Sequence, residues 1–346
     1  MPEGPPGRHA LTAASIAAPA SALLLTACLM MALVIAQPFA LNVIGIMVLG
    51  TAHVVLALRY LTGRVTGALT NTTVQVLIVV VAAMALIRAL SVLDAGLGHR
   101  LELVGSVIII GGAAWLGLRG RLRYLALAVI AFWALASLVQ LPWYWHLLTH
   151  AHNLVPLIFL WDWARRYRAG SGLAFTAVNL VWALAVPALI LAGAADRFIN
   201  AISPQFVSRL ADPQFVLAST AAPHSSPELA LRFLVVFTYL QTMHYVVWMG
   251  FLQIAGRREI TRLETAVPII AGWRFWLVVL SASLIVWLVY ATGYYNGRAV
   301  YGVIGAVNVY LEQPIAVWVL LAALPTRLTS DLVQRLASAQ SAVVGV

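Results

Sequence analysis

Five histidines lie within or at the ends of long apolar segments: His53, His146, His150, His152 and His244. Ionisable side chains are costly at membrane depth, and those found there usually serve a function. Neutral imidazole is also the commonest metal ligand in proteins. Histidines that several helices bring to a similar depth would suit a metal or haem centre inside a bilayer.

The spacing of the middle three histidines limits how they can act together. His146 and His150 are four residues apart and share one helix face with Asn153, which is the spacing that helical metal sites use. His152 points about 200° away from His150 on a regular helix, unless the helix unwinds near Pro156. We therefore expect either the His146/His150 pair or His152 to bind, and not all three as equal ligands.

Depth decides which histidines can meet. His53 and His244 each lie roughly 22 Å into their apolar segments, whereas His150 and His152 lie roughly 12–15 Å into theirs. Helix tilt and side-chain reach can close this gap. We expect His53, His150 and His244 to be metal ligands, with His146 or His152 as a fourth.

Two further residues are expected to take part in the chemistry. Glu312 lies about 12 residues into the last apolar segment, one turn after Asn308, and is a candidate metal ligand or a partner that orients a histidine. The alternative for Glu312 is an ion pair with Arg88. Tyr245 follows His244 directly and is expected to donate a proton or to hold an imidazole in place.

The composition is that of a membrane protein. Of 346 residues, 62% are hydrophobic and 9% are charged, compared with about 25% charged in soluble proteins. The sequence contains no Lys, which excludes a retinal Schiff base and a P-loop. The single cysteine, Cys28, excludes a disulfide framework, an iron–sulfur set and a C-x-x-C-H haem attachment site.

We expect an all-α, polytopic membrane bundle of about ten transmembrane helices in one domain, residues 1–346. The predicted spans are 12–36, 38–60, 71–93, 101–118, 122–141, 142–167, 173–194, 229–255, 273–293 and 300–324. With this count, 15 of the 21 Arg residues fall on one side, and the positive-inside rule makes that side and both termini cytoplasmic. Topology thus accounts for the net charge of +10, and no nucleic-acid partner is expected.

Three segments lie outside the predicted spans. Residues 1–10 and 327–346 are expected to be peripheral cytoplasmic tails. Residues 195–228 are expected to form an extracytoplasmic loop, which is a lid, a short amphipathic helix or a poorly ordered connector. The lipid bilayer is the first expected partner, and the cytoplasmic membrane of a bacterium is the expected location.

Two short motifs resemble those of integral-membrane polyhistidine oxygenases. Gly50-Thr51-Ala52-His53 resembles the G-x-x-H of the Brp/Blh-type carotene-cleaving dioxygenases. His146-x3-His150 is similar to the H-x3-H of that family and of the fatty-acid desaturases and hydroxylases. The chain has no H-x2-H-H box and no acidic residue soon after His53. The resemblance implies non-haem iron, an apolar lipid or isoprenoid substrate, oxidation by O₂ and a possible redox partner.

Other functions stay open at this point. Copper or zinc would also suit imidazole ligands. Two histidines on facing helices, such as His53 and His244, would suit haem and electron transfer. Glu312-Gln313-Pro314 would suit a proton-coupled transporter. The histidines of residues 146–152 also adjoin an aromatic run at 143–145 that is typical of a membrane interface without any chemistry.

Overall fold

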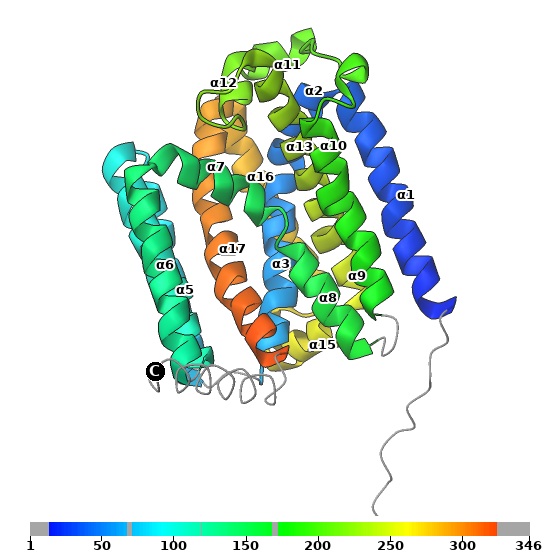
Figure 1. Cartoon of the computed structure of the whole chain (residues 1–346). Coiled ribbons are helices and arrows are strands. Elements are labelled where there is room, and N and C mark those ends of the chain that lie inside the picture. The colour runs from blue at the N-terminus through cyan, green and yellow to red at the C-terminus, as the bar shows by residue number, and fades with distance from the viewer. Residues whose placement is uncertain (1–13, 68–70, 119, 168–171, 324–346) are drawn as a thin grey trace, which may run out of the picture.

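The computed structural model describes residues 14–67, 71–118, 120–167 and 172–323, and these residues form helices with no strand among them (Figure 1). The all-α prediction is confirmed for this part of the chain. The predicted tails, 1–10 and 327–346, lie outside the described residues.

Eight helical segments are long and apolar enough to cross a membrane. They are α1 (Ala14–Ala36), α2 to α3 (Pro38–Val65), α5 (Ala95–Gly117), α6 (Gly120–Val139), α9 to α10 (Gly172–Leu191), α13 to α14 (Pro227–Ala255), α16 (Trp273–Ala291) and α17 (Tyr294–Ala323). A ninth helix, α4 (Asn71–Leu90), has a shorter apolar stretch. The count of ten spans stays a prediction.

The predicted span at 142–167 is divided into two helices, α7 (Leu141–His152) and α8 (Pro156–Tyr167). Pro156 has no N–H to donate to the carbonyl of His152, which accepts instead from Val155 at 3.1 Å. Leu157 donates to Leu154 at 3.0 Å, so it does not reach the carbonyl of Asn153. Figure 1 shows α7 crossing the bundle obliquely before α8 turns along it.

Three spans change from α- to π-helical geometry partway along. The π segments are η1 (Gly45–Leu49) between α2 (Pro38–Ile44) and α3 (Gly50–Val65), η2 (Val181–Ala185), and η4 (Val246–Phe251) after α13 (Pro227–Tyr245). Such segments occur often at functional sites. Here η1 ends four residues before His53 and η4 begins two residues after His244, so both histidines stand at changes in helix geometry.

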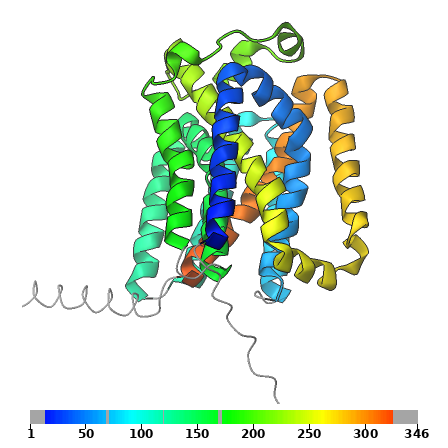
Figure 2. The same ribbon diagram turned by 90° about the vertical axis from the view of Figure 1, so that its right-hand side faces the viewer.

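The end of the bundle at which α1 begins and α17 ends carries an amphipathic helix, α15 (Arg257–Ala266) (Figures 1 and 2). Buried acidic side chains hold it and α8 together: Arg166 donates to Asp162 at 2.9 Å and also to Glu259. The beginning of α1 and the end of α17 thus lie on the same side of the bundle. The assignment of that side to the cytoplasm stays a prediction.

The opposite end is covered by part of residues 195–228, which contain two short helices, α11 (Gln205–Leu210) and α12 (Pro213–Ala218) (Figure 1). Asp212 opens α12 by accepting from the N–H of Gln214 at 3.0 Å. Its own N–H donates to the hydroxyl of Tyr295 near the start of α17, at 3.1 Å. This segment is therefore fastened to the bundle by its contact with Tyr295, and its extracytoplasmic location stays a prediction.

We expect Gly63→Ala to destabilise the protein, because a methyl group there would overlap the carbonyl oxygen of Glu259 on α15. Overpacking of this kind costs about 1–3 kcal/mol, and thermal unfolding in detergent would show a lower midpoint. The control is Gly112→Ala on α5, where a methyl group meets no atom within 4 Å. Equal midpoints for the two variants would contradict the close approach of α15.

Candidate metal centre

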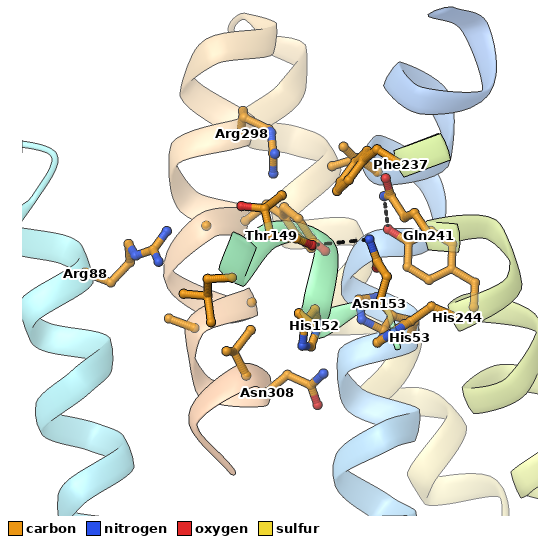
Figure 3. A pocket seen from close by; sticks show the side chains of 18 of the residues that line it. His53, Arg88, Thr149, His152, Asn153, Phe237, Gln241, His244, Arg298 and Asn308 are labelled. Carbon is orange, nitrogen blue, oxygen red and sulfur yellow. Dashed lines mark hydrogen bonds between the residues drawn. The ribbon is translucent and has the colours of Figure 1, made fainter. Parts of the chain in front are cut away.

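Three imidazoles from three helices come together inside the bundle (Figure 3), and the carboxylate of a residue on a fourth helix faces one of them. They belong to His53 on α3, His152 at the end of α7, His244 on α13, and Glu312 on α17. The rings of His53 and His244 have centroids 5.2 Å apart, and those of His152 and His244 are 4.8 Å apart. His152 Nδ1 lies 3.3 Å from Glu312 Oε2.

Six polar atoms of this cluster have no hydrogen-bond partner in the part of the chain that the structure describes. Both ring nitrogens of His53 and of His244 are buried and unpartnered, as are Nδ1 of His152 and Oε2 of Glu312. One ligand atom from each of His152, His244 and Glu312 lies within 4.8 Å of the others. A metal with bonds of about 2.1 Å would hold its ligand atoms roughly 3–4 Å apart. These three side chains therefore fit an ion after a small inward movement, and His53 lies next to them against the ring of His244.

Local backbone geometry turns the rings toward this point. The break before Pro156 leaves the carbonyl of Asn153 outside the helical hydrogen bonds, and it lies beside the ring of His244. The carbonyl of Gly50 lies likewise beside His53. Carbonyl groups in these places commonly accept from the imidazole nitrogen that does not bind the metal and so fix the tautomer. Each histidine can then present its other nitrogen to an ion.

Glu312 is oriented by its neighbour one turn earlier. Asn308 Nδ2 donates to Glu312 Oε1 at 2.6 Å, which leaves Oε2 facing His152. Arg88, the alternative partner of Glu312, instead donates to Glu102, which also accepts from the hydroxyl of Tyr310 at 2.6 Å. The expected alternative of an Arg88–Glu312 ion pair is therefore wrong.

Tyr245 packs directly against the centre. Its ring lies over that of His53, with centroids 4.5 Å apart. Gln241 Nε2 donates to the tyrosine hydroxyl at 2.5 Å, so this side chain is held in one place. The contact with His53 agrees with a role in positioning an imidazole, and proton donation by Tyr245 stays a prediction.

The other two histidines form a separate pair nearer the covered end of the bundle. The rings of His146 and His150 are 4.5 Å apart, and His150 Nε2 lies 2.9 Å from the carbonyl oxygen of Thr220. Phe233 packs against both rings. The structure thus places His152 with His53 and His244, in the position expected of His150. His152 lies about 200° round α7 from His150, so His152 faces the centre while His150 faces the segment that covers α7.

A cavity of about 160 Å³ adjoins the three central histidines (Figure 3). Much of its wall is apolar, with Ile46, Phe237 and Val309 among the lining residues. Apolar cavities of about this size accept a molecule such as benzene. The arrangement therefore joins a set of metal-ligating side chains to a space for an apolar group.

Comparison of the chain with models of protein families, with curated proteins and with solved structures gave no match. The two motifs that resemble the polyhistidine oxygenases have different places in the structure. The histidine of Gly50-Thr51-Ala52-His53 lies at the centre, whereas His146-x3-His150 lies apart from it.

We expect His152→Ala to abolish high-affinity metal binding, because it removes a nitrogen that faces both His244 and Glu312. Titration of the purified, metal-free protein with Co²⁺, followed by its visible absorption, would measure this loss. His150→Ala is the matched control from the same helix and should bind Co²⁺ like the parent protein. Loss of binding in His150→Ala with retention in His152→Ala would overturn the assignment.

Asn308→Leu should weaken metal binding 10- to 100-fold, the usual effect of losing a group that orients a ligand. The variant keeps all four ligands but frees the carboxylate of Glu312. Asn296→Leu on the same helix is the control, because Asn296 is exposed and bonds only to Thr292 in the described residues. An unchanged Co²⁺ affinity in Asn308→Leu would show that Glu312 needs no such support.

Proposed function

We propose that this protein is a membrane-embedded metalloenzyme that holds non-haem iron with His53, His152, His244 and Glu312 and oxidises an apolar substrate. One observation carries the proposal: ligand atoms of His152, His244 and Glu312 lie within 4.8 Å of one another, His53 packs against His244, and the three histidines line a largely apolar cavity. The membrane location suits a lipid or isoprenoid substrate, which would reach the cavity from the bilayer.

The charge of the cluster supports an ion. Glu312 is fully buried, and among the described residues only the amide of Asn308 donates to it. An ionised carboxylate without a compensating cation is very costly in such a place. A divalent cation would neutralise Glu312 and would bind one nitrogen of each neighbouring histidine.

The arrangement favours a single ion over haem. A porphyrin occupies the four equatorial positions of its iron and separates two axial imidazoles on opposite faces. Here His53, His152 and His244 adjoin one another, and a carboxylate shares the same point. This grouping leaves no room for a porphyrin plane between the rings, and electron transfer through haem is the weaker alternative.

The mixture of ligands favours iron. Histidines with one carboxylate and open coordination positions are typical of non-haem Fe(II) oxygenases, whereas zinc has no redox chemistry. When bound, iron would supply activation of O₂ for oxidation of the substrate. The protein would supply the cavity that holds the substrate, the contact of Tyr245 that fixes His53, and the bond from Asn308 that fixes Glu312.

Metal analysis and a visible spectrum of the detergent-purified protein test this function first. We expect near-stoichiometric iron and no Soret band. O₂ uptake by the iron-loaded protein would then be measured with β-carotene and with oleate as substrates. Ascorbate would serve as the electron donor in each assay. His152→Ala should lose both the iron and the uptake, and His150→Ala should keep both.

Other outcomes would replace the proposal. A Soret band would indicate haem and electron transfer. Stoichiometric zinc or copper would retain the centre but change its chemistry. Absence of any metal after loading would leave His152 and Glu312 as a candidate proton relay, and proton-coupled transport would become the better interpretation.

A further inference from the structure

Arg298 lines the same cavity as the three central histidines (Figure 3). It lies in the second turn of α17, four turns before Glu312, or about 21 Å along the helix axis. In Figure 3 its side chain points down from the upper part of α17 toward the level of the histidines. The cavity therefore has a guanidinium group toward one end and imidazoles toward the other.

The charge of Arg298 has no acidic partner in the part of the chain that the structure describes. The other arginine that lines the cavity, Arg88, is paired with the buried carboxylate of Glu102. Arg298 is half-buried and only stacks on the ring of Tyr301, 5.6 Å from its centroid. Arginines within membrane segments are usually paired. An unpaired guanidinium facing a cavity is therefore placed for an external anion.

The helix adds to this positive charge. The N-terminal end of a helix carries a partial positive charge that favours anions and disfavours cations. Arg298 is close to the beginning of α17, so the helix does nothing to compensate it. Its aromatic neighbour Tyr301 carries no charge that could pair with it. An anion bound here would meet a positive group without a competing carboxylate.

Small residues of α17 form the cavity wall between Arg298 and the central histidines. Gly302, Gly305 and Ala306 follow Arg298 on α17 and line the cavity. A methyl group added at Gly302 would meet no atom within 4 Å, so this part of the helix faces open space. Phe237 lies across the cavity. The space beside these small residues suits an apolar chain or ring, which extends the site from a charged end to the metal ligands.

We propose that Arg298 binds a terminal oxyanion of the substrate, a carboxylate or a phosphate, while the apolar body of the substrate lies along Gly302 and Ala306 toward His53, His152 and His244. This inference rests on the proposed function, because it treats the cavity as the substrate site of that enzyme. It adds the substrate class, which is an anionic amphiphile. Both oxyanions suit the planar fork of a guanidinium.

The test is calorimetric binding of three six-carbon probes, hexanoate, monohexyl phosphate and hexan-1-ol, to the detergent-purified full chain. Each probe would be tested with metal-free and with iron-loaded protein. We expect an anionic probe to bind at least 10-fold more tightly than hexan-1-ol. The tighter of hexanoate and monohexyl phosphate then identifies the oxyanion, and either supports the site.

Variants connect the binding to these residues. Arg298→Gln should remove the preference for the anionic probes, whereas Arg298→Lys should keep part of it. Arg209→Gln on α11 removes an exposed arginine that lines no described cavity, and it should change nothing. Gly302→Leu should weaken all three probes by filling the space beside α17.

The outcomes separate this proposal from that of the metal centre. Equal binding of hexan-1-ol and the acids, or an anion preference that survives in Arg298→Gln, overturns the oxyanion site even if iron is bound stoichiometrically. A protein that binds no metal but loses its anion preference in Arg298→Gln retains the oxyanion site and disproves the metal centre. Metal content of Arg298→Gln should equal that of the parent protein, because the guanidinium touches none of the four ligands.

Discussion

A carboxylate inside a membrane protein needs compensation by other groups, and this requirement organises the interior. Glu102 accepts from an arginine and a tyrosine, Asp162 from three arginines, and Glu259 from an arginine and a tyrosine. Glu312 is as deeply buried as these but receives only the amide of Asn308 and faces imidazoles. Glu312 is therefore the one of these four buried carboxylates that no arginine of the described residues compensates.

Much of the candidate site could be predicted from where the histidines fall in their helices. His53 and His244 lie at equal depth in two spans that run the same way, and the structure brings their rings together. Glu312 was expected from its type and depth alone. The partner from the middle span could not be settled, because regular helical spacing pairs His146 with His150. His152 lies about 200° round the helix from His150, and only the packing of α7 in the bundle decides which of these two faces meets the centre.

Other features depend on contacts between segments that are far apart in the chain. Hydropathy does not reveal that Arg88 forms an ion pair with Glu102. Because of this pair, Arg88 is not available to Glu312. The helix at Arg257–Ala266 also has too many charged residues to look like a span, and its place is set by contacts with Gly63 and Arg166. The all-α class follows from the long apolar segments, since a run of about 20 apolar residues matches the length of a helix that spans a bilayer and satisfies its own backbone hydrogen bonds.

The π segments have a consequence for how these spans relate to lipid and to protein. A π turn contains one more residue than the α turn it replaces, so the two parts of a span before and after it are out of phase by roughly 100°. In the span Pro38–Val65, the helical faces before Gly45 and after Leu49 are therefore out of register with each other. Any sequence aligned to this span that lacks the π turn should carry a one-residue gap within 45–49. Placing that gap after His53 would assign the wrong residue to the position of His53.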